Sequence, residues 1–223
     1  MMSQSSLASA PFPVYLVRHG QTEWNAERRF QGQRDVRLNA TGRQQAHAVA
    51  AWLARQPVDF RALHTSDSAR SCVTAQVIGR RFGLTPVQTP ELREIDTGEW
   101  TGLTRDDIEH IAPGRMAKWR ESFSTFAFPG GESAGQVIER MLAYYRECLA
   151  AHRGGGMLIV SHGTGLGGFL SVLLGWDVDV AFQQRQTRFH NTGVTIVRYD
   201  PATDTHNLVA HNLTEHLQTM PSV

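Results

Sequence analysis

Short apolar segments alternate with longer amphipathic segments along most of this chain. Runs rich in β-branched and aromatic side chains predict buried strands at residues 14–17, 62–65, 85–88, 157–160, 193–199 and 206–210. Apolar positions that recur every three or four residues predict helices at residues 43–55, 133–152 and 166–174, and a further helix that ends at Phe82 and has Ser66 or Ser68 as its N-cap. One or two further short helices are expected within residues 106–126, interrupted at Pro113-Gly114.

This alternation of strands and helices predicts an α/β fold, a three-layer sandwich in which helices flank a mostly parallel central sheet. No internal repeat or linker divides the sequence, so residues 12–223 are expected to form a single domain. Residues 1–11 lack the basic start of a signal peptide and are expected to be a disordered leader. No apolar run approaches the roughly 20 residues that cross a bilayer, which favours a cytoplasmic protein.

The composition narrows the range of partners. The chain has 223 residues, 41% of them hydrophobic, and its 22 basic and 21 acidic residues give a formal net charge of +1. A nearly neutral chain gives no global reason to expect nucleic acid or an anionic membrane as partner. Cys72 and Cys148 lie in helical patterns without metal-ligand spacing and are expected to be reduced. An exposed strand edge would permit a homodimer, although nothing in the sequence specifies one.

Two histidines, His19 and His162, each follow a predicted apolar strand and precede a glycine. Ligands of open α/β sheets gather outside the carboxyl ends of the strands, so both histidines are placed for function. Either one alone could be satisfied by backbone groups, but together they favour a site. A neutral imidazole can attack phosphorus and form a phosphohistidine. Arg18 and Arg70 could bind the oxygens of the transferred group.

Four segments carry a family resemblance. Residues 16–25, which read LVRHGQTEWN, closely resemble the signature of the histidine phosphatase superfamily, in its phosphoglycerate mutase-like branch. Residues 65–70, 92–102 and 160–163 resemble three further motifs of that family, in the same order. The similarity extends from about Val14 to Leu217, and it implies the family's phosphoglycerate mutase-like α/β fold.

The resemblance also implies roles for individual residues. His19 would accept the phosphoryl group while Arg18, Arg70 and His162 bind its oxygens. Glu94 would protonate the leaving alkoxide and then assist the water that hydrolyses the phosphohistidine. On physical grounds alone, Glu94 would be interpreted as a solvated loop carboxylate, so its role depends on the motif.

Other positions match the family's phosphate contacts. These positions are Asn25, Gln31 and Gly32, with Thr22 as a weaker candidate of the same kind. The resemblance requires no metal and no cofactor, and the remaining histidines show no metal-ligand spacing. The sequence departs from the family after Gly163, where an arginine is usual in the following helix. Residues 164–168 are instead rich in glycine.

The resemblance favours a phosphatase over a mutase. Mutases of this family usually have a tyrosine-glycine stretch after the proton donor, whereas residues 95–100 resemble the phosphatase branch. Mutases also carry a longer insertion than residues 104–129 provide. That segment contains Trp119, Phe123, Phe126 and Phe128, which are interpreted as the packed core of a short cap or, alternatively, as an apolar lid.

The expected protein is thus a histidine acid-type phosphatase that hydrolyses a small phosphorylated metabolite through a phosphohistidine. Cofactor-dependent phosphoglycerate mutase activity is the first alternative. A non-catalytic module that binds phosphate ligands is the second, and the full set of catalytic residues argues against it.

Overall fold

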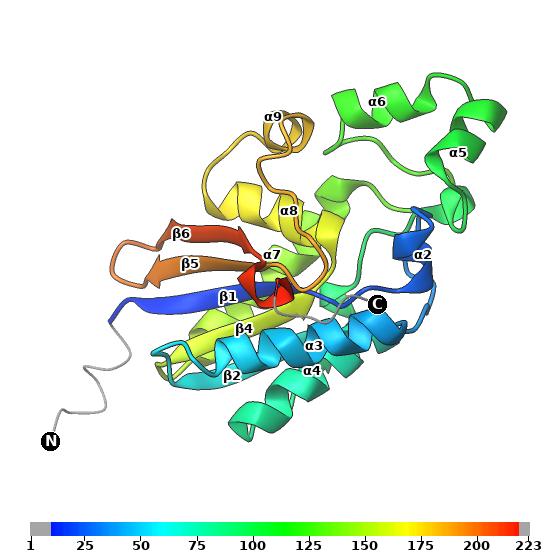
Figure 1. Cartoon of the computed structure of the whole chain (residues 1–223). Coiled ribbons are helices and arrows are strands. Elements are labelled where there is room, and N and C mark those ends of the chain that lie inside the picture. Colours follow the sequence, from blue (N-terminus) through cyan, green and yellow to red (C-terminus); the bar gives the residue numbers. More distant parts are fainter. Residues whose placement is uncertain (1–9, 219–223) are drawn as a thin grey trace, which may run out of the picture.

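The computed structural model describes residues 10–218, which form a central sheet with helices on both faces (Figure 1). The sheet has six strands in the order β3-β2-β4-β1-β5-β6. Their bounds are β1 (Phe12–Arg18), β2 (Phe60–Ser66), β3 (Val87–Thr89), β4 (Gly156–Ser161), β5 (Val194–Asp200) and β6 (Thr205–Leu213). Strands β1 to β4 pair in parallel, whereas β5 pairs antiparallel with β1 and β6. The predicted mostly parallel sheet is therefore confirmed.

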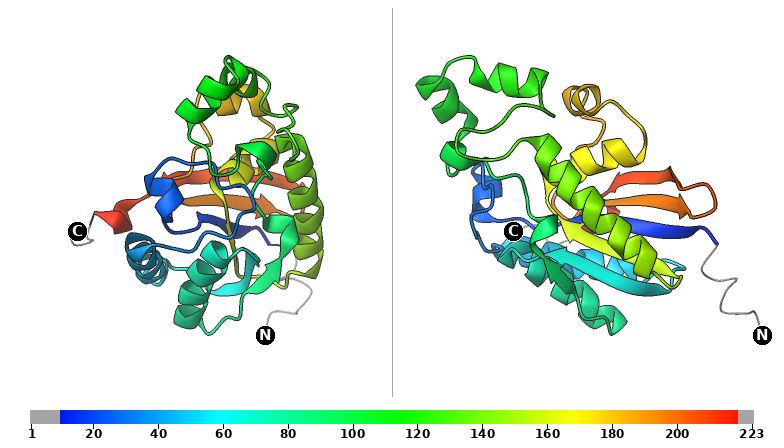
Figure 2. Two further views of the ribbon diagram at one scale, coloured as in Figure 1. Left: turned by 90° about the vertical axis from the view of Figure 1, so that its right-hand side faces the viewer. Right: turned by 180° about the vertical axis from the view of Figure 1, so that it is seen from behind.

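The helices cover both faces of this sheet, as the left view of Figure 2 shows. Helices α3 and α4 lie on one face, and α7 and α8 lie on the other. The helices are α2 (Glu23–Ala26), α3 (Ala40–Leu53), α4 (Ala69–Phe82), α5 (Arg105–Ile111), α6 (Arg115–Glu121), α7 (Ala134–Ala151), α8 (Gly163–Leu173) and α9 (Val178–Gln183). This is the predicted three-layer sandwich.

The side chains of β1 alternate between the two faces of the sheet and contribute to a separate hydrophobic core on each face. Val14 and Leu16 pack with α7 and α8, whereas Tyr15 and Val17 pack with α3 and α4. All four side chains are buried, as expected for a parallel strand covered on both faces. The apolar run that predicted this strand is thus explained by burial on both sides.

Two helix starts differ from the prediction, those of α3 and α8, whereas α4 starts after Ser68, one of the two N-cap positions that the sequence offered. Helix α3 begins at Ala40, because the Asn39 side chain accepts a hydrogen bond from the backbone of Gly42. Helix α4 begins after Ser68, but the Ser68 side chain makes no cap hydrogen bond, and Asp35 accepts the amide of Ala69 instead. Helix α8 begins at Gly163, earlier than the glycine-rich sequence suggested.

The segment between the third strand and α7 forms a cap at one end of the molecule (Figure 1). As predicted, it holds two short helices, α5 and α6, separated around Pro113-Gly114. Trp119, Phe123 and Phe128 are at most 5% exposed and belong to the main hydrophobic core. The interpretation of these aromatic residues as core packing is therefore confirmed.

Helix α9 was not predicted. It lies beside α6, and its Phe182 stacks on Phe123 with ring centroids 3.8 Å apart. Asp179 accepts hydrogen bonds from the amide and hydroxyl of Ser124. These contacts attach the cap to the segment between α8 and β5.

Both cysteines are free and buried, as predicted. Among residues 10–218, no helix has the length and apolar character needed to cross a membrane. The predicted leader, residues 1–11, lies almost wholly outside the described residues, and β1 begins directly after it at Phe12.

Candidate active site

Four of the predicted catalytic residues, Arg18, His19, Arg70 and His162, lie at or just after the carboxyl ends of β1, β2 and β4. Arg18 is the last residue of β1, and its register partner in β4 is Ser161. His19 and His162 therefore follow paired positions, and their ring centroids lie 5.1 Å apart. Arg70 reaches the same place from the first turn of α4, which follows β2.

The His19 imidazole is held in one tautomer. Its Nδ1 lies 2.7 Å from the carbonyl oxygen of Gly20. Because a carbonyl oxygen only accepts, Nδ1 carries the proton, and the lone pair of Nε2 is free for attack. Burial lowers the pKa of His19 well below its usual value, and the charges of Arg70 and Arg18 add to the effect. The ring is thus neutral, as a nucleophile must be.

His162 has the opposite tautomer. Arg70 Nε donates to its Nδ1 at 3.2 Å, so the proton sits on Nε2, which lies 2.9 Å from Ser66 Oγ. Burial, followed by the charges of Arg70, His19 and Arg18, lowers the pKa of His162 well below its usual value. In this structure both ring nitrogens of His162 therefore bind protein groups.

Arg70 is almost fully buried and is fixed at three points. Its Nη1 donates to the carbonyl of Arg34 at 2.7 Å, and its Nη2 donates to that of Gly32 at 2.8 Å. With Nε on His162, each terminal nitrogen retains one further N–H group for a ligand. The guanidinium is thus preorganised for a bound anion.

Arg18 has a buried donor group that no protein atom of residues 10–218 satisfies. Its Nη1 donates to the carbonyl of Phe189 at 2.9 Å, but its buried Nε has no hydrogen-bond partner within the described residues. Burial and the charges of Arg70 and Arg188 lower the pKa of Arg18 to about 10, against the opposing effect of Glu94. The group is still cationic at neutral pH, and a buried unpaired donor is costly unless a ligand satisfies it.

Glu94 is anchored by the start of α8. Its Oε2 accepts the amide of Thr164 at 3.0 Å, and its Oε1 accepts the amides of Gly165 at 2.8 Å and Ile95 at 3.0 Å. Amides in the first turn of a helix have no partner within the helix and favour a negative group. Glu94 therefore explains why α8 starts within a glycine-rich segment.

Arg140 and its ion-pair partner Glu132 hold the segment around Glu94 in place. Arg140 of α7 donates to the carbonyls of Glu91 and Glu94 at 2.7 and 3.1 Å. It also forms an ion pair with Glu132 at 3.2 Å, and Glu132 accepts the amide of Asp96. Sequence reasoning missed this support, because the three segments are far apart along the chain.

The four other candidate phosphate contacts, Thr22, Asn25, Gln31 and Gly32, have different surroundings. Thr22 caps α2 and its hydroxyl contacts Asn25, so it is engaged in local structure. The Asn25 Oδ1 accepts hydrogen bonds, and its Nδ2 donates none within residues 10–218. The carbonyl of Gly32 binds Arg70, and the buried Gln31 Oε1 has no partner in that same part of the chain.

Asn191 is a residue that the sequence did not single out. Its Nδ2 donates to the carbonyl of His19 and to Asn25 Oδ1, both at 3.1 Å. It therefore joins the nucleophile to a candidate phosphate contact from the loop before β5. No local motif marks it, since a single asparagine in a loop most often serves a turn.

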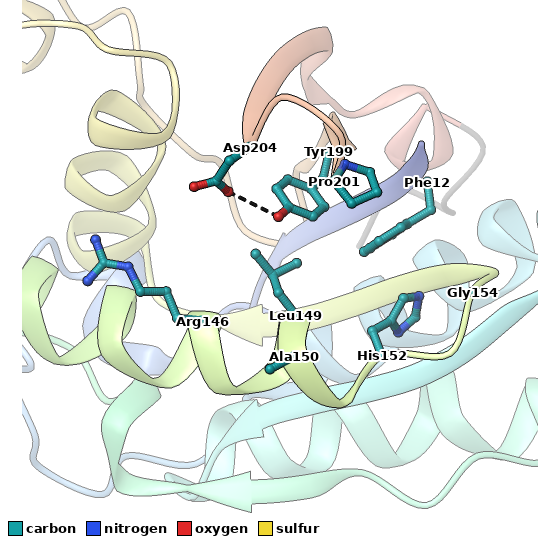
Figure 3. A pocket seen from close by; sticks show the side chains of 9 residues that line it. All are labelled: Phe12, Arg146, Leu149, Ala150, His152, Gly154, Tyr199, Pro201 and Asp204. Carbon is teal, nitrogen blue, oxygen red and sulfur yellow. Dashed lines mark hydrogen bonds between the residues drawn. The ribbon is translucent and has the colours of Figure 1, made fainter. Parts of the chain in front are cut away.

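Two pockets of the protein do not include the predicted catalytic side chains. One, of about 400 Å³, lies at the opposite end of the sheet, between Phe12, His152 and the hairpin that joins β5 to β6 (Figure 3). The other, of about 480 Å³, is lined by Asn191 and Gln21 but by none of the predicted catalytic side chains. Within the described residues, no group of three or more histidine, cysteine or acidic side chains could hold a metal ion.

Because many of its histidines are buried, we expect the folded protein to lose stability in mild acid. Burial is the main cause of a lowered pKa in His19, His64, His152, His162, His190, His206, His211 and His216. In the unfolded chain these groups take up protons near pH 6.5, whereas in the folded chain they do so only at lower pH. The stability that these histidines contribute is therefore fully present above pH 6.5, and it is lost as the pH falls below that value.

The pKa of His216 is lowered to about 4. From this group alone we expect a loss of about 3 kcal/mol of unfolding free energy between pH 6.5 and pH 4. Urea unfolding at pH 7.5, 6 and 5 measures how the unfolding free energy changes with pH. An unfolding free energy that stays constant or rises over that interval would contradict it.

Comparison with known proteins agrees with the motifs. A family model described as histidine phosphatase superfamily (branch 1) matches residues 14–214. The chain is 37% identical over 188 residues to the probable phosphoglycerate mutase GpmB of Serratia proteamaculans, a match that covers 82% of this chain and 83% of that one.

Solved structures give the same fold. The mycobacterial glucosyl-3-phosphoglycerate phosphatase in complex with VO3 aligns with a TM-score of 0.82 and 31% identity, over 91% of this chain and 99% of that one. Bacillus stearothermophilus YhfR aligns with a TM-score of 0.83 and 30% identity, over 92% of this chain and 99% of that one.

Proposed function

The chain belongs to branch 1 of the histidine phosphatase superfamily, and from this premise we propose that it hydrolyses a small phosphorylated metabolite. The observation that carries the proposal is the cluster of buried guanidinium groups around a neutral nucleophile. His19 Nε2 keeps its lone pair, and the buried Nε of Arg18 lacks a partner within residues 10–218. A phosphoryl oxygen would supply that partner.

The proposed reaction has two displacements. In the first, His19 Nε2 attacks phosphorus, the bond to the ester oxygen breaks, and Glu94 gives that oxygen a proton. In the second, water attacks the phosphohistidine, Glu94 takes a proton from the water, and inorganic phosphate leaves with Nε2 restored. Arg18 and Arg70 stabilise the charge on the equatorial oxygens in both steps.

Further residues complete the proposed site. His162 holds Arg70 through its Nδ1, and its Nε2–H would donate a hydrogen bond to a phosphoryl oxygen in place of its bond with Ser66. Asn25 would bind phosphate through its Nδ2. Because the pKa of His19 is lowered, the neutral imidazole persists below pH 6.5, which supports the acid-type assignment. We also propose that the protein is cytoplasmic.

Mutase activity is the competing function, because the similar GpmB protein of Serratia is named a probable phosphoglycerate mutase. The similar mycobacterial structure is named a phosphatase, and the cap is short, which supports hydrolysis. A non-catalytic role accords poorly with a buried histidine whose lone pair is free.

One preparation can separate these functions. Incubation with 3-phosphoglycerate, with and without 2,3-bisphosphoglycerate, allows phosphate release and formation of 2-phosphoglycerate to be measured together. A phosphatase releases phosphate with little isomer. Rapid isomerisation that 2,3-bisphosphoglycerate stimulates, with little free phosphate, would overturn hydrolysis in favour of the mutase. If neither this ester nor p-nitrophenyl phosphate reacts, the enzymatic proposal fails.

A further inference from the structure

The turn that precedes β5 contains a strained residue beside the nucleophile. Thr192 is fully buried, and its backbone φ is 55°. This left-handed conformation is unfavourable for a residue that is branched at Cβ, so it persists only where surrounding contacts hold it. Backbone strain of this kind is concentrated at active sites, where the fold keeps a residue in one arrangement.

Contacts from two other segments hold Thr192 in this conformation. Its amide donates to the carbonyl of Arg18 at 3.0 Å and to that of His19 at 3.3 Å, at the end of β1. Its hydroxyl donates to the carbonyl of Asn191 at 2.8 Å and lies 3.1 Å from Nε2 of His216. His216 is buried in a short helical turn after β6, and that turn packs on α3. The position of Asn191 is therefore fixed by both segments.

The side-chain amide of Asn191 donates both of its N–H groups. Its Nδ2 lies 3.1 Å from the carbonyl oxygen of His19 and 3.1 Å from Oδ1 of Asn25. The carbonyl oxygen only accepts, and the Asn25 oxygen is identified by the backbone amide of Thr22, which only donates to it. The Asn191 nitrogen thus faces two acceptors, and no other orientation of either amide satisfies all three contacts.

The first of these bonds fixes the backbone of the nucleophile. The peptide group that joins His19 to Gly20 is held at its carbonyl by Asn191 and at its amide by Oγ1 of Thr74, 3.1 Å away. The carbonyl of Gly20 in turn accepts the proton of His19 Nδ1 and so sets the tautomer of the ring. A shift of this peptide group would therefore move both the imidazole and the group that keeps its Nδ1 protonated.

The second bond fixes the orientation of Asn25. Oδ1 of Asn25 accepts from Asn191 and from both the amide and the hydroxyl of Thr22. With that oxygen occupied, Nδ2 of Asn25 is the group that remains for a phosphoryl oxygen. One side chain, Asn191, therefore holds the nucleophile and a proposed phosphate contact in a fixed relation to each other.

From these contacts we infer that Asn191 is a positioning residue for phosphoryl transfer. It acts through the two groups that it binds, by setting the distance between His19 Nε2 and a phosphate held by Asn25. This inference rests on the proposed phosphatase function. Because a misplacement of about 1 Å can lower a rate by about 10²-fold, such a residue contributes to kcat without taking part in the chemistry.

Asn191→Leu tests the inference, because leucine branches at the same atom as asparagine but donates no hydrogen bond. We expect kcat for p-nitrophenyl phosphate to fall by about 10- to 100-fold in this variant, with a smaller change in KM. Asn207→Leu is the matched control, since Asn207 is an exposed asparagine of β6. Its kinetic constants should equal those of the wild type. If Asn191→Leu does not fold, Asn191→Ala is measured in the same way.

A double-variant cycle with Asn25→Ala separates positioning from a general loss of structure. Because Asn191 acts partly through Asn25, the loss of kcat/KM in Asn25→Ala/Asn191→Leu should be smaller than the product of the two single losses, by at least about 3-fold. Losses that simply multiply would refute the link between the two asparagines.

NMR measures the effect on His19 without any substrate. Two-bond ¹H–¹⁵N correlation spectra report the tautomer of each histidine, and the His19→Ala spectrum assigns the signals of His19. We expect the wild type to have its proton on Nδ1 and Asn191→Leu to have a mixture of both tautomers, because the Gly20 carbonyl is no longer held in place.

The outcomes distinguish this inference from the proposed function. A folded Asn191→Leu protein with the wild-type kcat and an unchanged His19 tautomer refutes the positioning role and leaves the phosphatase function intact. If the wild type releases phosphate from no ester, the phosphatase function is refuted. The NMR comparison then decides whether Asn191 positions His19: a changed tautomer supports the role, and an unchanged one refutes it.

Discussion

Replacing His19 with alanine is expected to lower phosphate release by at least about 10⁴-fold and to abolish covalent labelling of the protein. The reason is that Nε2 of this ring is the free, unprotonated nitrogen among the buried cations. Wild-type protein quenched during turnover of a ³²P-labelled ester should carry a label that is stable in base and lost in acid. Scintillation counting after gel filtration measures it.

His47→Ala is the matched control for His19→Ala. His47 is an exposed histidine of α3, so its removal should leave both the label and the rate at wild-type levels. Circular dichroism shows whether the His19→Ala chain is folded. A folded His19→Ala protein that still becomes labelled would place the nucleophile elsewhere.

Replacing Glu94 with glutamine is expected to lower kcat for an alkyl phosphate by about 10²- to 10⁴-fold, because an amide cannot protonate the leaving alkoxide. p-Nitrophenolate leaves without a proton. The loss should therefore be much smaller for p-nitrophenyl phosphate than for glycerol 3-phosphate. Steady-state kinetics on the two esters measure the difference.

The same substitution also tests the anchoring role of Glu94. One carboxylate oxygen accepts two amides and the other accepts the amide of Thr164. Glutamine can satisfy only one of these positions, so we expect a loss of about 1 kcal/mol in unfolding free energy. Glu99→Gln, an exposed carboxylate nearby, is the control for both measurements. Equal rate losses on the two esters would argue against Glu94 as the proton donor.

Much of this site could be predicted from the sequence because its residues follow the ends of predicted strands. An apolar run buried on both faces must be a central strand, and parallel strands bring their carboxyl ends together. His19 and His162 could therefore be paired from the sequence. Arg70 could be added because its helix follows another such strand.

Other parts of the site could not be predicted from local pattern. Glu94 lies in an irregular segment, where only the family motif distinguished it from a solvated carboxylate. The start of α8 was missed because glycine lowers helix propensity, and the compensating partner, Glu94, is far away along the chain. Asn191 and Arg140 act across the fold, so no local pattern could mark either residue.

The first turn of α8 holds Glu94 by its amides, and the residue that precedes this turn is His162. Glu94 and His162 are therefore both attached to the same helix, α8. A substitution that tilts α8 against α7 would displace both groups together. In a mutational scan, defects at Glu94 and His162 should accordingly share their suppressors, and positions on the facing side of α7 are where those suppressors should arise.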